Sequence, residues 1–219
     1  IGKIYVYTHN TPYYFSNLEE FCIVNKINYT KEKIFLKNLP FNPDLIISIS
    51  YRYKIPSNVL KKTKYNGFNL HPSLLPYYKG CNSLMWAMIN NERYVGYTYH
   101  FLSNNFDEGN IIYQKKIKTY DFELLIQLYY RVMFESLKKL NYVINFVTSG
   151  KNGVKQKIIK IKNYYPRKLP FEGIISSKWE EDYTKRFIKS LNFPPLKSAS
   201  FNKIDIKDFK KYKKIINKK

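Results

Sequence analysis

The chain has 219 residues, enough for one domain with a full hydrophobic core and a small appendage. Lys and Arg outnumber Asp and Glu by 38 to 16, and this balance would attract phosphates, nucleic acids or anionic membranes without indicating any particular chemistry. No apolar run approaches the ~20 residues of a membrane span, no signal-peptide pattern is present, and Cys22 and Cys81 match no metal or redox spacing, so we expect a cytoplasmic protein with reduced cysteines and no membrane partner.

Strand and helix patterns alternate over the first 150 residues. In chain order they predict a strand at 3–8, a helix at 18–28, a buried strand at 45–49, a short helix at 56–62 that begins with proline, a strand at 67–70, a helix at 82–91, strands at 94–102 and 110–117, and a helix at 121–148. Asp121 is the predicted N-cap of the last helix, and Ser149-Gly150 is its predicted end. The alternation indicates an α/β layered sheet.

The character of the chain changes after Gly150. Lys and Ile alternate at 157–162, prolines follow, a short helix is predicted at 179–191, and the tail at 203–219 carries eight Lys against two Asp. We expect this tail to be solvated and partly disordered or helical. The predicted organisation is therefore a catalytic domain at 1–150 and a C-terminal extension at 151–219.

The densest motif is Asn-Leu-His-Pro-Ser-Leu-Leu-Pro at 69–76, followed by Tyr-Tyr-Lys-Gly at 77–80. Asn69 and His71 are two residues apart at the carboxyl end of a strand, so their side chains share one face. Ligands of open α/β sheets bind outside the carboxyl ends of the strands. An amide and an imidazole there suit a reaction centre. The alternative is a structural loop histidine and an asparagine that caps a turn.

A second motif, Gly-Tyr-Thr-Tyr-His-Phe at 96–101, leads to Asp-Glu-Gly-Asn at 107–110. Asp107 precedes a glycine turn between two strands, where its carboxylate could face the same cleft as His71. The alternative is an aspartate that merely fills a β-turn. His100 lies within a strand among aromatic residues, and we interpret it as a packed or hydrogen-bonded structural residue.

The order Asn-x-His-x-Ser-Leu-Leu-Pro, Trp-Ala, Gly-x-Thr-x-His and Asp-x-Gly resembles the folate-dependent formyltransferase family over about residues 40–150. That family includes glycinamide ribonucleotide, methionyl-tRNA and nucleotide-sugar amine formyltransferases. The resemblance implies a Rossmann-like core with a mostly parallel sheet and N10-formyltetrahydrofolate as formyl donor. It also implies that Asn69, His71 and Asp107 are the catalytic residues.

These residue types suit formyl transfer. When an amine attacks the formyl carbon, the carbonyl oxygen becomes anionic, and Asn69 can donate an N–H to it. His71 can take the proton of the amine or stabilise the oxyanion, and Asp107 would orient His71. The resemblance further places the folate on main-chain groups of the segment after the 45–49 strand, that is Tyr51, Arg52, Tyr53, Lys54 and Ile55. The alternative for this segment is a plain strand-to-helix connection.

The C-terminal pattern bears on the acceptor. Tyr-Tyr-Pro-Arg at 164–167, Trp179, Arg-Phe-Ile at 186–188 and Pro-Pro at 194–195 resemble the segment of sugar N-formyltransferases in which a hairpin helps to build a dimer. This resemblance implies a nucleotide-linked amino-deoxysugar as acceptor, a homodimer, and O-antigen biosynthesis as the setting. The candidate substrate-binding residues are Ser73, Tyr78, Lys79, Asn82 and Trp86, and core packing is the alternative for Trp86.

Two other functions stay open. Methionyl-tRNA as acceptor would suit the positive charge, but only about 70 residues follow Gly150, too few for the extra domain of those enzymes. A non-catalytic, basic nucleic-acid-binding module is the other alternative, and nucleic acid is an unlikely partner because no recognised binding module is present. His9, His71 and His100 show no metal-ligand spacing, so no metal is expected. The family normally begins with a strand and a helix before the equivalent of Lys3. The sequence shows no such unit, so we expect one sheet edge and part of the folate site to differ here.

Overall fold

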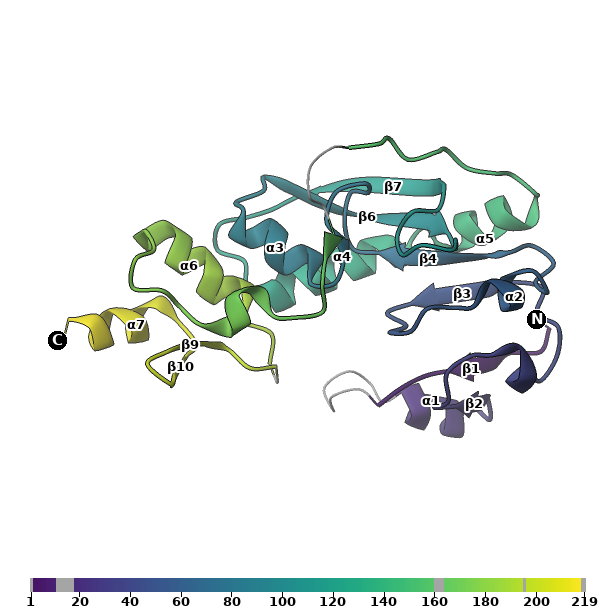
Figure 1. Ribbon diagram of the computed structural model, residues 1–219, viewed down its shortest axis with the longest axis horizontal. Coiled ribbons are helices and arrows are strands. Elements are labelled where there is room, and N and C mark those ends of the chain that lie inside the picture. Colours follow the sequence, from purple (N-terminus) through teal and green to yellow (C-terminus); the bar gives the residue numbers. More distant parts are fainter. Residues whose placement is uncertain (1, 11–17, 160–163, 195, 218–219) are drawn as a thin grey trace.

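The strands and helices predicted over residues 3–117 are present in the predicted order, and the structure adds two short strands among them, at 28–30 and 79–80 (Figure 1). The computed structural model describes residues 2–10, 18–159, 164–194 and 196–217. The elements are β1 (Tyr5–Tyr7), α1 (Leu18–Val24), β2 (Asn28–Thr30), β3 (Ile46–Ile49), α2 (Ser57–Leu60), β4 (Gly67–His71), β5 (Lys79–Gly80), α3 (Ser83–Ile89), β6 (Tyr94–Phe101), β7 (Ile111–Lys118), α4 (Leu125–Leu137), α5 (Leu140–Thr148), β8 (Tyr164–Tyr165), α6 (Glu181–Ser190), β9 (Ala199–Phe201), β10 (Ile204–Ile206) and α7 (Phe209–Ile216), with short 3-10 helices at Leu36–Asn38 and Pro170–Gly173.

The central sheet has four strands in the order β3-β4-β6-β7. β3 and β4 pair in parallel, whereas β4 with β6 and β6 with β7 pair antiparallel. A turn rather than a crossover helix joins β6 to β7, which suits their antiparallel pairing, whereas β5 and α3 lie between β4 and β6 in the chain. β1 and β2 form a separate parallel pair that lies beyond β3 in Figure 1. The predicted α/β class is confirmed, and parallel pairing joins β1 to β2, β3 to β4 and β5 to β8 within the described ranges.

The main core lies between the sheet and helices α3, α4 and α5. Its largest fully buried side chains include Tyr97 and Tyr99 of β6, with Phe68 of β4 packed edge-on against Tyr99. Each buried phenol has a partner, since the hydroxyl of Tyr97 donates to the carbonyl of Glu135 at 3.0 Å and that of Tyr99 to the carbonyl of Ser136 at 3.0 Å. These bonds fix the end of α4 over the sheet.

The prediction of a single helix from Asp121 to Thr148 is wrong at the start of the helix and in its middle. The helix begins only after Leu124, whose backbone is extended, because residues 120–124 form a turn around the buried Glu123 carboxylate. The chain then breaks between α4 and α5. The carbonyls of Glu135 and Ser136 that would continue the helix accept hydrogen bonds from the tyrosine hydroxyls of β6. The predicted end is confirmed, with Gly150 at φ 75° just past α5.

The C-terminal extension folds around a second core. Ile206 of β10 is fully buried there and Tyr212 of α7 nearly so, together with Phe187 and Leu191 from α6 and its end. Partial disorder of the tail is therefore wrong for residues 204–216, whereas the helical alternative holds for α7, which Asp208 caps. Ile89 of α3 belongs to the same core, so the residues after 170 pack against α3. Within the described ranges, no helix is long and apolar enough to cross a membrane.

Candidate active site

A cavity of about 530 Å³ opens at the carboxyl ends of β3 and β4. Its lining comes from β3, β4 and β6, from residues 50–55 after β3, and from the loop between β6 and β7. It contains the side chains predicted to be catalytic, the whole predicted folate segment and one of the five predicted acceptor residues; these are Asn69, His71, Asp107, Tyr51, Arg52, Tyr53, Lys54, Ile55 and Asn82.

The Asn69 amide is held between the neighbouring strands. In the sheet register, Ser48 of β3 and His100 of β6 lie directly opposite Asn69. The Ser48 hydroxyl donates to Asn69 Oδ1 at 2.9 Å, and Asn69 Nδ2 lies 3.1 Å from His100 Nε2. His100 Nδ1 lies 2.9 Å from the Phe101 carbonyl, which can only accept, so Nε2 is the acceptor for the amide. One N–H of Asn69 is thus bound and the other stays available for a ligand.

His71 and Asp107 meet in the same cavity. His71 Nδ1 lies 3.6 Å from Asp107 Oδ1, an ion-pair distance, and His71 Nε2 lies 2.8 Å from the Tyr78 carbonyl, to which it must donate. Asp107 Oδ1 is also 3.5 Å from His100 Nε2, and Asp107 Oδ2 accepts from the Gly80 N–H at 2.7 Å. The Asp107 carboxylate therefore joins the two imidazoles to the loop that follows β4.

Burial sets the protonation states. It lowers the pKa of His71, although the Asp107 carboxylate opposes this shift, so His71 is neutral near pH 7 with an open Nδ1. For Asp107, burial favours the neutral form, but the neighbouring His100 and His71 rings and the Gly80 N–H outweigh burial and lower the pKa of the carboxyl to about 2. A neutral imidazole beside an ionised carboxylate is an arrangement suited to accepting a proton.

The structure adds Gln156, which sequence reasoning missed. Its Nε2 donates to the carbonyls of Asp107 and Gly109, each at 2.8 Å, and so holds the turn that presents the carboxylate. The turn needs such support because Asp107 has φ 56° in the left-handed region. Gln156 follows Gly150 in a stretch without periodicity, so only the tertiary contact reveals it. Ser48 was likewise missed, since nothing in an apolar strand marks its hydroxyl as an amide partner.

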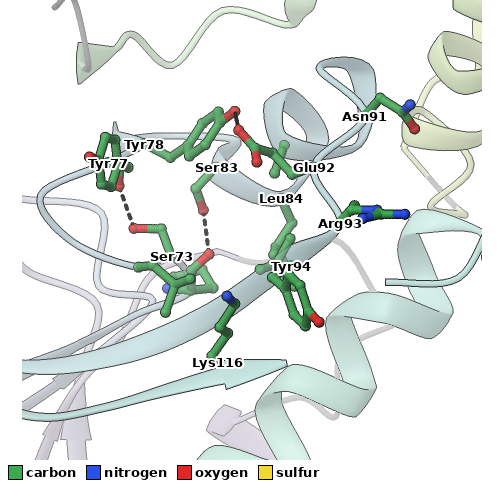
Figure 2. A pocket seen from close by; sticks show the side chains of 14 residues that line it. Ser73, Tyr77, Tyr78, Ser83, Leu84, Asn91, Glu92, Arg93, Tyr94 and Lys116 are labelled. Atoms are coloured by element: carbon green, nitrogen blue, oxygen red, sulfur yellow. Dashed lines mark hydrogen bonds between the residues drawn. The ribbon is translucent and has the colours of Figure 1, made fainter. Parts of the chain in front are cut away.

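Four predicted acceptor residues lie outside this cavity. Ser73 and Tyr78 line a second cavity of about 490 Å³ (Figure 2). There the Ser73 hydroxyl donates to the Tyr77 carbonyl, and the Tyr78 phenol donates to Glu92 Oε1 at 2.6 Å. The ammonium of Lys79 pairs with Glu108 at 3.4 Å.

Trp86 takes the packing role that was its alternative. Its ring lies 4.9 Å from that of Tyr165 and 5.6 Å from that of Phe171. Asn82 does line the first cavity, and its Nδ2 donates to the Lys168 carbonyl at 2.9 Å. The sequence places these residues near the catalytic strand correctly, but the loop turns most of their side chains away from the cleft.

The segment predicted to bind folate presents free main-chain groups. Within the described ranges, the N–H and C=O groups of Tyr53, Lys54 and Ile55 have no main-chain hydrogen bond, and all three residues line the cavity. Such groups can bind the polar edge of a planar heterocycle. Among the described residues, no three His, Cys, Asp or Glu side chains gather to hold a metal ion.

Comparison with known proteins gives the same assignment. Residues 18–144 match the family model described as formyl transferase. The chain is 37% identical over 204 residues to the GDP-perosamine N-formyltransferase of Brucella melitensis, and the match covers 91% of this chain and 78% of that protein. The formyltransferase PseJ from Anoxybacillus kamchatkensis, solved with UDP-4,6-dideoxy-4-formamido-L-AltNAc and tetrahydrofolate, is 27% identical with a TM-score of 0.59 over 76% of this chain and 86% of that chain. An N-formyltransferase from Helicobacter canadensis shares the fold, with a TM-score of 0.72 at 24% identity over 90% of this chain and 72% of that chain. The chain therefore belongs to the formyl transferase family.

Proposed function

We propose that this chain transfers a formyl group from N10-formyltetrahydrofolate to the amine of a nucleotide-linked amino-deoxysugar. The observation that carries the proposal is the convergence of Asn69, His71 and Asp107 in one cavity. Similarity supports the acceptor class, because the Brucella relative, a GDP-perosamine N-formyltransferase, matches the C-terminal extension as well as the core, over 91% of the chain. The complex of PseJ with a formamido sugar nucleotide and tetrahydrofolate supports the same acceptor and donor.

The first task of the site is to manage a proton. The amine must lose one as its nitrogen bonds to the formyl carbon, and the neutral His71 accepts it at Nδ1. The imidazolium formed there lies beside the Asp107 carboxylate, 3.6 Å away, which stabilises it. The proton is then available for the nitrogen that leaves the formyl carbon. His71 Nε2 keeps its bond to the Tyr78 carbonyl throughout, which fixes the ring.

The second task is to stabilise the developing oxyanion. N10-formyltetrahydrofolate, when bound, supplies the formyl carbon whose oxygen gains this charge. The free N–H of the Asn69 amide donates to that oxygen, and the Ser48 and His100 contacts hold the amide in one orientation before the reaction begins. A preorganised donor of this kind lowers the activation barrier by about 3 kcal/mol.

The donor site in this proposal uses the main-chain groups of residues 51–55, which face the same cavity as Asn69. Ser50 turns the chain into this segment with φ 56°. The proposal also includes a cytoplasmic location and a homodimer. The free thiols of Cys22 and Cys81 fit a reducing compartment, and light scattering of the purified protein measures the number of subunits.

An acceptor panel tests the proposal. The protein is incubated with N10-formyltetrahydrofolate and, separately, with GDP-, UDP- and dTDP-linked amino-deoxysugars, methionyl-tRNA and glycinamide ribonucleotide, while release of tetrahydrofolate is followed. Formylation of an amino sugar alone supports the proposal. Formylation of methionyl-tRNA alone supports the alternative acceptor, and turnover with glycinamide ribonucleotide alone also contradicts the sugar assignment.

A further inference from the structure

Three basic side chains from distant parts of the chain line one end of the catalytic cavity. His9 follows β1, Arg52 follows β3, and Arg167 follows β8. The Arg167 guanidinium donates from Nη2 to the Arg52 carbonyl at 3.0 Å, which ties the extension to the segment after β3. The His9 ring lies edge-on to Tyr53, whose centroid is also 6.0 Å from the Arg52 guanidinium. The fold thus brings two guanidinium groups and an imidazole to one place.

No carboxylate neutralises this group in the described part of the chain. Neither guanidinium takes part in a salt bridge there, and Asp107, the acidic side chain in the cavity lining, is held by His71, His100 and Gly80. The positive field is felt by His9, whose pKa is lowered first by burial and then by the charges of Arg52 and Arg167. A bound anion would reduce the repulsion between the two guanidinium groups.

We propose that Arg52 and Arg167, with His9 beside them, bind the diphosphate of the nucleotide-linked sugar. This subsite rests on the proposed function, because that acceptor class carries two phosphates. Planar guanidinium groups match phosphate oxygens in a bidentate manner. His71 and Asn69 line the same cavity, so a sugar amine can lie at His71 while the diphosphate reaches the exposed arginines. The Arg167–Arg52 contact positions one guanidinium before the ligand arrives.

A γ-carboxylate of a folate glutamate tail offers the same anionic chemistry, so the test must separate the two ligands. The binding of GDP, UDP and dTDP is measured by calorimetry on the full chain and on the variants Arg52→Ala and Arg167→Ala. Arg93→Ala is the matched control, because Arg93 is exposed and lies outside the catalytic cavity, so its replacement removes the same charge elsewhere. We expect the preferred nucleotide to bind about 10-fold more weakly, or worse, to each cavity variant. The nucleotide affinity of Arg93→Ala should stay within about 2-fold of the wild-type value. The melting temperature of every variant should stay within a few degrees of that of the wild type.

Steady-state kinetics then assign the anion. The subsite predicts a raised KM for the nucleotide sugar in Arg167→Ala, with an unchanged KM for both mono- and triglutamyl N10-formyltetrahydrofolate. Arg167→Lys recovers part of the affinity, because it restores the charge but not the planar fork. A raised KM for the triglutamyl donor with unchanged nucleotide affinity overturns the assignment, as does failure of every nucleotide to bind the wild-type chain.

The two proposals fail in different ways. If the wild-type chain binds a nucleoside diphosphate through these arginines but formylates no amino sugar, the subsite stands and the proposed function is refuted. If an amino sugar is formylated and the arginine variants bind nucleotide normally, the function stands and the subsite is refuted.

Discussion

The Ser48 hydroxyl is the sharpest place to perturb the oxyanion donor without touching it. Ser48→Ala removes the hydrogen bond that fixes Asn69 Oδ1, while Nδ2 keeps its contact with His100. A neutral hydrogen bond of this kind contributes about 1 kcal/mol net. If all of this free energy holds the amide in its catalytic orientation, kcat of Ser48→Ala falls about 5-fold, since about 1.4 kcal/mol corresponds to a factor of ten.

The size of this effect is diagnostic when it is compared with Asn69→Ala. Removal of the donor itself costs about 100- to 1000-fold in kcat. Ser48→Ala should therefore lie well between the wild type and Asn69→Ala, with an unchanged KM for both substrates. Single-turnover measurements at saturating substrate give the chemical step directly.

Ser48→Thr is the control, because it retains a hydroxyl and a β-branched side chain suits a strand. It should keep most of the activity that Ser48→Ala loses. The reasoning is refuted if Ser48→Ala is as fast as the wild type, or if it is as slow as Asn69→Ala while the melting temperature is unchanged.

Three further predictions concern the rest of the site and its support. His71→Ala and Asp107→Asn should each lower kcat by about 100-fold or more with little loss of stability, and kcat/KM of the wild type should rise with pH through a midpoint below the ordinary histidine value, because burial lowers the pKa of His71. In Asp107→Asn that midpoint should move to still lower pH, since the carboxylate raises the pKa of His71; a shift to higher pH in the residual activity would contradict this. Gln156→Ala removes two hydrogen bonds from the Asp107 turn, so we expect a loss of about 2 kcal/mol in unfolding free energy and a lower kcat at unchanged KM. Gln156→Glu should lower both quantities further, because it places an acceptor against two carbonyls. If both variants are as active as the wild type, this role of Gln156 is refuted. Glu123→Ala leaves Arg131 without its bidentate partner and should lower the unfolding free energy by about 2–4 kcal/mol in urea titrations, with kcat unchanged in the folded fraction.

Part of the candidate active site could be predicted from local spacing. Asn69 and His71 lie on one strand two residues apart, so a shared face follows from backbone geometry alone. The convergence of Asp107 with them depended on the combined motif order, because an aspartate before a glycine turn is by itself ambiguous. The folate segment at 51–55 was predicted from the resemblance to the formyltransferase family, and its residues line the cavity.

The parts that could not be predicted depend on contacts between distant residues. The break between α4 and α5 coincides with hydroxyl groups of β6 that bond to helix carbonyls, and no helical pattern contains that information. Ser73 and Tyr78 face the second cavity because the 72–78 loop turns away from the cleft after Pro72. The Lys-rich tail was judged by its charge, although Ile206 and Tyr212 supply the apolar face that orders it.

In the proposed reaction, one cavity brings a folate-borne formyl group to a sugar amine. The most direct test is a single reaction of the wild-type chain with N10-formyltetrahydrofolate and a nucleotide-linked amino-deoxysugar, in which tetrahydrofolate and the formamido sugar are both quantified. The account predicts that the two products appear in equal amounts and that both are lost in His71→Ala. Release of tetrahydrofolate without any formamido sugar, or equal product from His71→Ala, would contradict it.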